Sequence, residues 1–429
     1  MFKIDNVLIE GFWGQHTVET DFNNDVNIFI GRNGTGKSTF INLLQAVISV
    51  DLELLFGLQF EKIIVLLKDG KKKRKIEVTK IAHDLQYKEL QYQIGSKKFK
   101  LPVIPERELK YITKRSGRIH PRFYRDIQEI KAILSKLVNV SYLSVNRDNI
   151  AKEDFRDSRR EDVYNAIDVR LEELIGELTS YQLQLETDLS RLSKKFQEDV
   201  LKSNLFNEEF DYVNINEPVK LDYRRIQLGL KQAYRGLGIL DDKITENIDK
   251  HVAAIQKAAD AINIHVKDKE KPVYPNDVTP LTLLGRTRKI NELSSELEKD
   301  KKRIFERLND YIKMLNDFHE TKEFTLQDSK IGGISIFKEE VEIPLSQLSS
   351  GEKQLIILLT EALLQKGAQT LFIADEPELS LHIEWQRRVI PSIRTLNPNS
   401  QIIVATHSPE IVGKFKQRTI NMEKIINNG

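Results

Sequence analysis

The sequence has 429 residues, of which 40% are hydrophobic and 30% are charged, enough apolar material for roughly two or three folded units and too much for a disordered chain. It contains no cysteine, which excludes disulfides, thiolate zinc sites and cysteine nucleophiles. The first residues lack the apolar core of a signal peptide, and no apolar run is long enough to span a bilayer. We therefore expect a cytoplasmic protein with no membrane partner.

The charges balance over the whole chain but not along it. The 66 basic and 64 acidic residues give a net charge of +2. Residues 62–125 alone hold 19 basic and 6 acidic side chains, a local charge of +13, so the remainder sums to −11. Such a basic segment could follow a DNA duplex. A solvated hairpin that pairs with the acidic surface of a neighbouring subunit explains it equally well.

The N-terminal part predicts strands followed by a helix. Alternating or apolar runs predict strands at residues 2–11, 18–22 and 26–30, and a helical pattern continues to Val47. Residues 63–67 and 76–81 are apolar runs around an Asp-Gly turn and predict a hairpin. A further strand is expected at 138–145. We expect residues 1–60 to begin one domain and residues 61–160 to form a β-rich basic subdomain with its return strand.

The middle of the chain, residues 161–323, predicts a helical insertion. Apolar residues recur every seven positions in two stretches, from Leu171 to Leu192 and from Ile290 to Phe318. This period favours two long helices packed as an antiparallel coiled coil, although an ordinary helical bundle is an equal alternative. More helix is expected over residues 223–264. Residues 324–429 return to an α/β pattern, with strands at 370–374 and 401–405.

Residues 31–38, Gly-Arg-Asn-Gly-Thr-Gly-Lys-Ser, carry the strongest chemical signal. They fit the phosphate-loop pattern, in which glycines let backbone N–H groups surround phosphate oxygens at the start of a helix. Lys37 is expected to reach the β- and γ-phosphates, and Ser38 to ligate Mg²⁺. The nucleotide-binding residues expected from this loop are Gly31, Arg32, Asn33, Gly34, Thr35, Gly36, Lys37, Ser38 and Thr39.

Three weaker patterns lie near the C-terminus. An apolar strand ends in Asp375 and Glu376, which beside a phosphate loop suit a metal ligand and a residue that polarises water. His407 follows the next strand, at the edge where parallel sheets bind nucleotides. Ser349 opens a helix and could bind a γ-phosphate, but an N-cap with Glu352 in a capping box is the simpler interpretation of its spacing.

Together these motifs resemble those of the ABC-type ATPases of the SMC, RecF and OLD superfamily. Residues 31–38 resemble Walker A, 348–354 the LSSGEKQ signature, 371–376 Walker B, 378–382 the D-loop, and 406–408 the switch histidine. The resemblance covers about the first sixty and the last hundred residues. It implies an α/β fold with an ABC-type nucleotide-binding domain split between the two ends of the chain, which we expect over residues 1–60 and 324–429.

The resemblance also implies a two-subunit ATP site. Ser349 and Gly351 of one subunit would close on the γ-phosphate held by Walker A of another, which displaces the capping-box interpretation. Asp375 and Ser38 would hold Mg²⁺, Glu376 would be the general base, and His407 would sense the γ-phosphate. The family often has a Q-loop glutamine after the strand at 138–145, whereas this chain has Asn146. Phe12, Trp13 and His16 are candidate adenine contacts only because they lie near the first strands.

Two functions follow as hypotheses. The size and the lack of a nuclease motif most resemble the stand-alone ATPase subunits of bacterial antiphage systems, of which AriA of PARIS and PtuA of Septu are examples. We therefore expect an ATP- and Mg²⁺-dependent homo-oligomeric sensor or scaffold that controls a separate nuclease or toxin effector. The alternative is a DNA-repair or DNA-structuring ATPase that binds DNA through residues 62–125.

Overall fold

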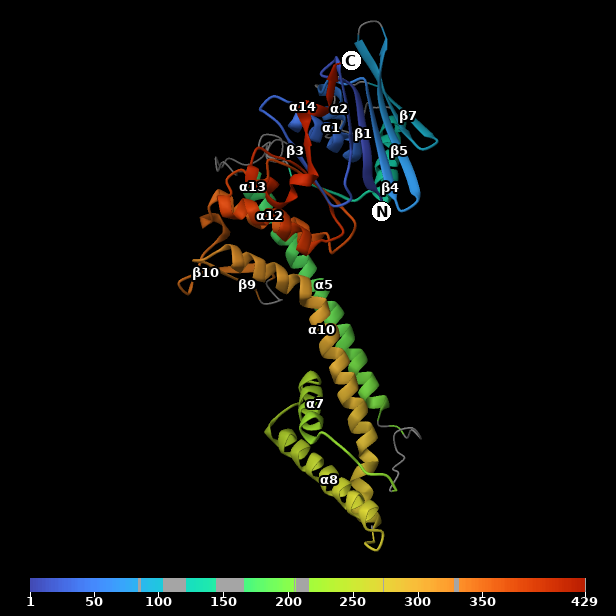
Figure 1. Cartoon of the computed structure of the whole chain (residues 1–429), viewed down its shortest axis with the longest axis vertical. Coiled ribbons are helices and arrows are strands. Elements are labelled where there is room, and N and C mark those ends of the chain that lie inside the picture. Colours follow the sequence, from blue (N-terminus) through green and yellow to red (C-terminus); the bar gives the residue numbers. More distant parts are fainter. Residues whose placement is uncertain are drawn as a thin grey trace. The chain divides into compact units, whose positions relative to one another are not determined.

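The computed structural model describes residues 1–83, 86–102, 121–143, 166–203, 205, 216–272, 274–327 and 332–428 (Figure 1). The chain forms two compact units. Unit 1 comprises Met1–Leu178, Asp310–Gln327 and Gly333–Gly429, and unit 2 comprises Thr179–Asn309 and Asp328–Gly332. Among the described residues, no helix is long and apolar enough to cross a membrane.

Unit 1 contains a seven-stranded antiparallel sheet in the order β15-β2-β1-β4-β5-β6-β7. Its strands are β1 (Lys3–Phe12), β2 (His16–Asp21), β4 (Lys62–Asp69), β5 (Lys72–His83), β6 (Gln86–Ile94), β7 (Lys97–Pro102) and β15 (Ile426–Asn428). Alternate residues such as Val65 and Ile76, which pair with each other, face the core and are fully buried. The segment predicted to be a basic subdomain therefore extends the sheet of β1 and β2 and does not form a sheet of its own.

A second sheet of unit 1 has five parallel strands in the order β14-β3-β13-β12-β8. These strands are β3 (Val26–Ile30), β8 (Val140–Leu143), β12 (Leu371–Asp375), β13 (Gln401–Ala405) and β14 (Thr419–Asn421). The carboxyl ends of parallel strands lie at one edge of the sheet, where ligands bind in such folds. A third sheet is formed by β9 (Glu323–Leu326), β10 (Ile334–Lys338) and β11 (Val341–Glu342).

Helix α1 (Lys37–Ser49) explains why the sequence after the phosphate loop is so apolar. Its residues Phe40, Leu44 and Val47 are fully buried in a core that also includes side chains of both large sheets. The Tyr142 hydroxyl donates a hydrogen bond to Asn42 Oδ1 at 2.9 Å. The nearby helices α2 (Leu52–Gly57) and α4 (Pro121–Leu137) complete this core, and α4 was not predicted.

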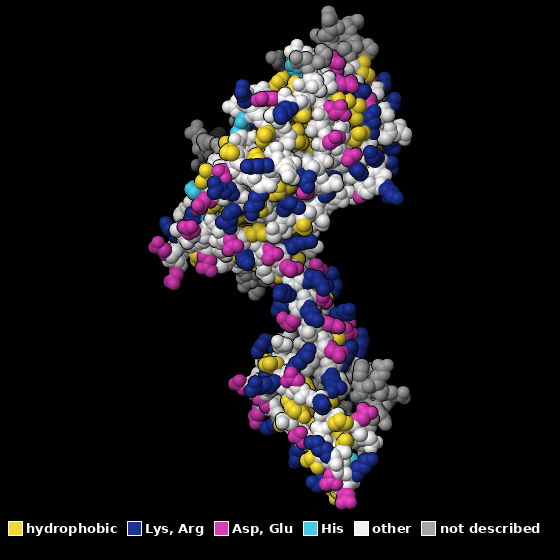
Figure 2. All heavy atoms as spheres, in the orientation of Figure 1, with side chains coloured by type: hydrophobic (Ala, Val, Ile, Leu, Met, Phe, Trp, Pro, Cys, Tyr) yellow, Lys and Arg dark blue, Asp and Glu magenta, His cyan; other side chains and the backbone are white. Residues whose placement is uncertain are grey.

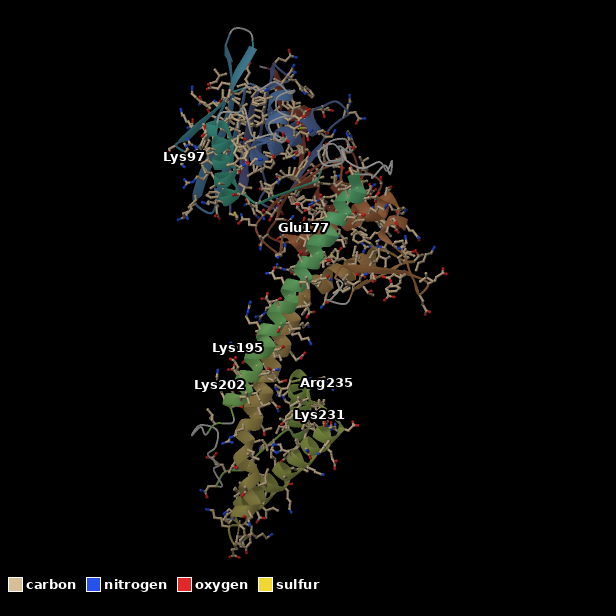
Figure 3. The ribbon with its side chains drawn as sticks, turned by 180° about the vertical axis from the view of Figure 1, so that it is seen from behind. Lys97, Glu177, Lys195, Lys202, Lys231 and Arg235 are labelled. Atoms are coloured by element: carbon tan, nitrogen blue, oxygen red, sulfur yellow. The ribbon has the colours of Figure 1, made fainter. Side chains whose placement is uncertain are left out.

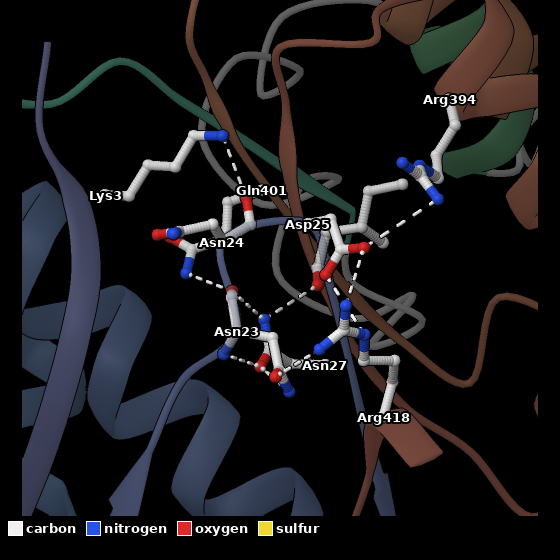
Figure 4. A network of polar contacts seen from close by, with 9 residues as sticks. Lys3, Asn23, Asn24, Asp25, Asn27, Arg394, Gln401 and Arg418 are labelled. Carbon is white, nitrogen blue, oxygen red and sulfur yellow. Dashed lines mark hydrogen bonds and ion pairs between the residues drawn. The ribbon is translucent and has the colours of Figure 1, made fainter. Parts of the chain in front are cut away.

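The remaining elements of unit 1 follow the third sheet. They are η2 (Leu345–Gln347), α11 (Ser350–Leu364), α12 (Ile383–Leu396), α13 (Pro409–Val412), η3 (Gly413–Arg418) and α14 (Met422–Ile425). A polar network connects the sheets at the end of β3 away from the phosphate loop (Figure 4). The amide of Gln401 in β13 bonds both Ile4 N and Ile4 O of β1 at 2.8 Å, and Arg418 Nε lies 3.3 Å from Asp25 Oδ1.

Two long helices, α5 (Ala166–Lys202) and α10 (Leu284–Phe318), each have residues in both units and run in opposite directions. Unit 2 also contains α7 (Tyr223–Gly236), α8 (Asp242–Lys267), α9 (Pro275–Val278) and η1 (Thr279–Leu283). In unit 2, Phe196 of α5 and Leu297 of α10 share a small core with Ala233 of α7. Charged side chains such as Lys195 on α5 and Arg235 on α7 project from these helices (Figure 3). The unit boundaries lie inside the long helices, so the ends of the predicted 161–323 insertion are part of unit 1.

Candidate functional site

The phosphate loop connects β3 to α1 in the way that the sequence predicted. Gly36 is the residue before the helix and has a left-handed backbone, with φ +85°. A Cβ at this position would lie 2.8 Å from the Phe12 ring and 2.9 Å from the Trp13 ring. Only glycine satisfies both the backbone conformation and the close approach of the two rings.

Lys37 closes the loop on itself. Its Nζ donates to the backbone carbonyls of Gly31 at 2.9 Å and Arg32 at 3.1 Å, and the residue is only 4% exposed. Burial lowers the pKa of the Lys37 ammonium from 10.5, although the carboxylates of Glu376 and Asp375 act in the opposite direction. The ammonium is thus held by carbonyl oxygens that phosphate oxygens can replace.

Asp375 ends β12 with a side-chain oxygen that lacks a partner. The Oδ1 atom is buried and has no hydrogen-bond partner in the described part of the chain. Burial raises the pKa of this carboxyl above 3.8, and a hydrogen bond from Ser38 offsets part of the increase. A buried, unpaired carboxylate oxygen beside a hydroxyl is a donor set of the kind that Mg²⁺ takes together with phosphate and water. Ser38 and Asp375 therefore fit the predicted metal site.

Glu376 and His407 face each other across two neighbouring parallel strands. Glu376 follows β12 and His407 follows β13, and Glu376 Oε1 lies 3.8 Å from His407 Nε2. The backbone of Glu376 has φ +47° and its N–H donates to the Ala405 carbonyl at 2.8 Å. Glutamate rarely adopts this conformation, so the turn holds the carboxylate in an uncommon but fixed position. Both side chains are partly exposed and accessible to a ligand.

The signature segment forms the capping box that its spacing predicted. The Glu352 N–H donates to Ser349 Oγ at 3.3 Å, and the Ser349 N–H donates to Glu352 Oε2 at 2.8 Å. Within the described chain, these hydrogen bonds stay at the start of α11 and do not reach the phosphate loop. Ser349 is exposed, so a ligand from outside the subunit can approach it. The two interpretations of Ser349 are therefore compatible, because the same residue can cap its own helix and still present its hydroxyl.

Gly351 is required by a close approach of the D-loop. A Cβ at Gly351 would lie 2.2 Å from the backbone carbonyl oxygen of Ser380. Such a contact forces backbone to move, because no flexible side chain can absorb it. The D-loop and the signature helix therefore fit together only when residue 351 is glycine.

Helix α11 is also held by both long helices where they enter unit 1. Lys353 donates to Asp168 of α5 at 2.7 Å, and Arg170 of α5 bonds Glu361. The hydroxyls of Tyr311 in α10 and Thr360 lie 2.8 Å apart.

A further contact to α11 comes from the segment that follows α10. Lys322 bonds Glu352 Oε1, and His319 Nε2 lies 3.9 Å from the same oxygen. Glu352, which completes the capping box of the signature helix, is therefore also bonded to the segment that follows α10.

Trp13 places an aromatic ring beside the phosphate loop. It is 38% exposed, with φ +55°, and its ring lies 4.9 Å from that of the buried Phe12. The His16 ring is 6.5 Å from the Trp13 ring in an edge-on orientation. Of the three candidate adenine contacts, Trp13 offers the exposed ring face that base stacking needs.

Sequence reasoning missed two carboxylates of this region. Glu378, which the motifs place only in the D-loop, accepts hydrogen bonds from the loop that carries His407. Glu423 in α14 accepts a hydrogen bond from the Arg32 N–H at 3.2 Å. No local pattern marks Glu423, because it reaches the loop only through the pairing of β14 with β3. Asn146, the predicted replacement for the Q-loop glutamine, lies outside the described residues.

A family model for the AAA ATPase domain matches residues 2–412, nearly the whole chain. The chain belongs to this family. It is accordingly an ATP hydrolase.

The chain is also similar to curated proteins described as retron ATPases. The chain is 26% identical over 307 residues to the retron Vc95 probable ATPase of Vibrio cholerae serotype O1 biovar El Tor, covering 62% of this chain and 54% of that protein. It is 31% identical over 94 residues to the retron Ec83 probable ATPase of Escherichia coli, covering 19% of this chain and 17% of that protein. The chain thus spans about half the length of the first relative and less of the second.

Among solved structures, similarity extends to SMC head domains. A Pyrococcus furiosus Smc head with an extended coiled coil, bound to the C-terminal domain of ScpA, aligns with a TM-score of 0.47 at 14% identity, covering 98% of this chain and 93% of that chain. A Pyrococcus yayanosii Smc head with a coiled coil and joint aligns with a TM-score of 0.39 at 16% identity, covering 98% and 95%.

Proposed function

We propose that this AAA ATPase binds ATP at the carboxyl edge of the parallel sheet and hydrolyses it with Glu376 as the general base. The observation that carries the proposal is the meeting of Glu376, His407 and the Lys37 loop at the ends of three adjacent strands. Glu376 orients and deprotonates the attacking water. Lys37 exchanges its two carbonyl partners for phosphate oxygens, and His407 donates toward the γ-phosphate.

Ser38 and Asp375 hold Mg²⁺ in this proposal. When bound, Mg²⁺ neutralises charge on the phosphates and polarises them. The support is the unpaired, buried Oδ1 of Asp375, which needs a positive partner, and the Ser38 hydroxyl beside it. Trp13 stacks on the adenine because its ring is the exposed aromatic surface next to Gly36.

The site is completed by the signature of a second copy of the chain. Ser349 is exposed and its own hydrogen bonds are internal, so the helix that it caps presents its N-terminus as a preformed anion site. A symmetric dimer then shares two sites between two subunits.

Complementation tests this arrangement. Lys37→Ala removes the phosphate contact, and Ser349→Arg fills the signature side of the site. Each variant alone should be inactive. An equimolar mixture should recover about a quarter of wild-type turnover when the sites are independent, because mixed dimers keep one intact site. A mixture as inactive as its components, with dimers present by light scattering, would mean that each site lies within one subunit.

We infer further that the ATPase acts as an oligomeric sensor or scaffold for a separate effector, a nuclease or toxin, in bacterial antiphage defence. Two relatives carry the name of retron ATPases. The contacts of α11 with both long helices support the mechanical part of this proposal. When the start of α11 closes on a nucleotide, any movement of α11 is transmitted to the two long helices through these contacts. The helical insertion can then transmit the movement to a partner.

Co-purification with the products of adjacent genes tests the scaffold role. Glu376→Gln, which should keep ATP bound, is expected to retain the effector, whereas Lys37→Ala should release it or fail to assemble. If both variants and the wild type bind no neighbouring product, and cells that lack the neighbouring genes resist phage equally well, the scaffold proposal is wrong.

The alternative is a DNA-repair or DNA-structuring ATPase. Its support is the β4–β5 hairpin, where Lys71, Lys72 and Arg74 are exposed and have no ion pair within the described chain. Figure 2 shows Lys and Arg side chains along the edge where Figure 1 places β4 and β5. Lys68 and Lys73, in contrast, both lie within 4 Å of Asp5, at 3.8 and 3.7 Å.

Charge reversal separates the two functions. Replacing Lys71, Lys72 and Arg74 by Glu should abolish DNA-stimulated ATPase activity if the hairpin binds DNA, and binding of wild-type protein should weaken steeply with salt. Under the scaffold proposal the same variant keeps its basal turnover and loses assembly or partner binding instead.

A further inference from the structure

The turn after Glu376 contains a third acidic residue, Glu378, whose carboxylate is buried. It is 8% exposed, and its Oε1 accepts three hydrogen bonds. The donors are the Thr406 hydroxyl, the His407 N–H at 3.0 Å and the Ser408 N–H at 3.2 Å. All three belong to consecutive residues of the loop that presents His407.

This arrangement differs from an ordinary helix or turn cap. A cap satisfies N–H groups of its own local segment, whereas Glu378 and residues 406–408 come from the ends of two different strands, β12 and β13. Three donors converge on one carboxylate oxygen, and charge-assisted hydrogen bonds are about twice as strong as neutral ones. The loop that bears His407 is therefore anchored to the Walker B turn through a single charged atom.

The loop is restrained from its other side as well. The Ser408 hydroxyl donates to Gln386 Oε1 at 2.6 Å and accepts from the Glu410 N–H at 3.1 Å. These contacts hold Ser408 but leave the Thr406 hydroxyl and the His407 N–H without another acceptor in the described contacts. Together with the hydrogen bond from the Thr406 N–H to the Phe29 carbonyl at 3.1 Å, Glu378 thus fixes the part of the loop from which the imidazole projects.

The second oxygen of the same carboxylate has no such partners. Glu378 Oε2 is buried and has no hydrogen-bond partner within the described residues. Glu378 also contributes to the negative field on Lys37 and on Asp375.

We propose that Glu378 is a positioning residue that sets His407 opposite Glu376, so that the imidazole meets the γ-phosphate while Glu376 remains free to act on water. The inference rests on the role of His407 given above. It adds that the Walker B turn and the switch loop move as one piece, because the Glu378 carboxylate joins them. Loss of the carboxylate then disturbs hydrolysis and not nucleotide binding.

The test compares Glu378→Gln with a matched control. Glu378→Gln keeps the shape and one acceptor oxygen but removes the charge, and Glu384→Gln makes the same change at an exposed residue of α12. With ATP and Mg²⁺, Glu378→Gln should lower kcat about 10- to 100-fold with KM changed less than about threefold, whereas Glu384→Gln should match the wild type.

A double-variant cycle gives a readout that a merely structural role would not move. If Glu378 acts through His407, adding Glu378→Gln to His407→Ala should cost no more than about twofold further in kcat. Independent effects that multiply in the double variant would overturn the proposal, as would a wild-type kcat in Glu378→Gln.

The two proposals can fail separately. If His407→Ala alone keeps wild-type turnover, the role of His407 is wrong; if it reduces turnover but Glu378→Gln does not, only the role of Glu378 is wrong. Should Glu378→Gln not fold, Thr406→Val replaces it, because it removes one of the three donors and leaves the carboxylate in place. Thr406→Val should lower kcat about three- to tenfold at constant KM, and unchanged kcat would contradict the proposal.

Discussion

The two halves of the proposed ATP site differ in whether their buried polar groups have hydrogen-bond partners. At the edge of the parallel sheet, Asp375 Oδ1 and Glu378 Oε2 are buried without partners in the described chain, and Lys37 is held by backbone carbonyls. At the start of α11, Ser349 and Glu352 satisfy each other, and Lys322 bonds the remaining Glu352 oxygen. The first half is arranged for ligands that are yet to bind, and the second is complete before any ligand arrives.

This difference indicates that the two halves of the site have different functions. Unpaired buried carboxylates cost stability and persist where a ligand later repays that cost. A satisfied cap on a helix that also binds both long helices behaves as a rigid part that can be moved as a whole. The sheet edge should therefore govern chemistry and nucleotide affinity, and α11 should govern closure and its link to the insertion.

The sharpest test of the sheet edge, with the largest expected effect, is Glu376→Gln. Removing the general base should lower kcat by about 100-fold or more while ATP still binds. The measurement is steady-state turnover combined with retention of labelled ATP on the filtered protein. A variant that hydrolyses ATP at the wild-type rate would show that another group activates the water.

Gly351→Ala tests whether the α11 half is rigid. The added Cβ would meet the Ser380 carbonyl oxygen at 2.2 Å, so the D-loop must shift. We expect a loss of about 1–3 kcal/mol in the free energy of unfolding and a tenfold or larger fall in kcat. Gly176→Ala in α5 is the control, because nothing lies within 4 Å of its added Cβ and helix propensity favours alanine by about 1 kcal/mol. Equal behaviour of the two variants would contradict a tight fit at Gly351.

Lys322→Met tests whether the bond from Lys322 to Glu352 stabilises the α11 half of the site. Its effect on stability should depend on pH. Burial alone would raise the pKa of Glu352, but hydrogen bonds from Lys322 and Ser349 outweigh it, so the pKa lies below 4.5. The stabilisation by ionised Glu352 is therefore present above about pH 4.5 and is lost as the pH falls through the lower native-state pKa.

Urea unfolding measures this effect. At pH 7, Lys322→Met should be about 2–4 kcal/mol less stable than the wild type, because Glu352 keeps its charge without its partner. The difference should shrink as the pH falls below 4.5. Lys313→Met, at an exposed position of α10, should stay within about 0.5 kcal/mol of the wild type. A pH-independent difference would mean that the Lys322 side chain stabilises by packing alone.

The smallest expected effect concerns adenine. Trp13→Ala should raise KM for ATP about tenfold with kcat little changed, since stacking contributes to binding and not to the transition state. The sequence has two tryptophans, Trp13 and Trp385. In a Trp385→Phe background, ATP should quench the remaining fluorescence. If ATP neither quenches it nor depends on Trp13 for its KM, adenine binds elsewhere.

Short motifs allowed the sheet edge to be predicted more fully than the contacts around it. Strand β3 has the predicted bounds of residues 26–30, and β12 and β13 lie within one residue of their predicted positions, because apolar runs ending in acidic or glycine-rich turns encode local structure. The heptads likewise marked the two long helices. The contacts of Glu378 with residues 406–408, of Glu423 with Arg32, and of Trp13 with Gly36 could not be predicted, because they depend on strand order and tertiary packing.

The place of the C-terminal strands has a consequence for how the protein is made. Strand β3 lies between β13 and β14, and β2 pairs with β15. Strands within the first thirty residues therefore obtain neighbouring strands from residues 401 onward. Contacts this distant along the chain form slowly and late. During synthesis the helices of unit 2 can pack before the phosphate loop has its neighbouring strands, and the N-terminal strands must wait with unpaired edges. Nucleotide binding should therefore begin only after the last strands have emerged from the ribosome.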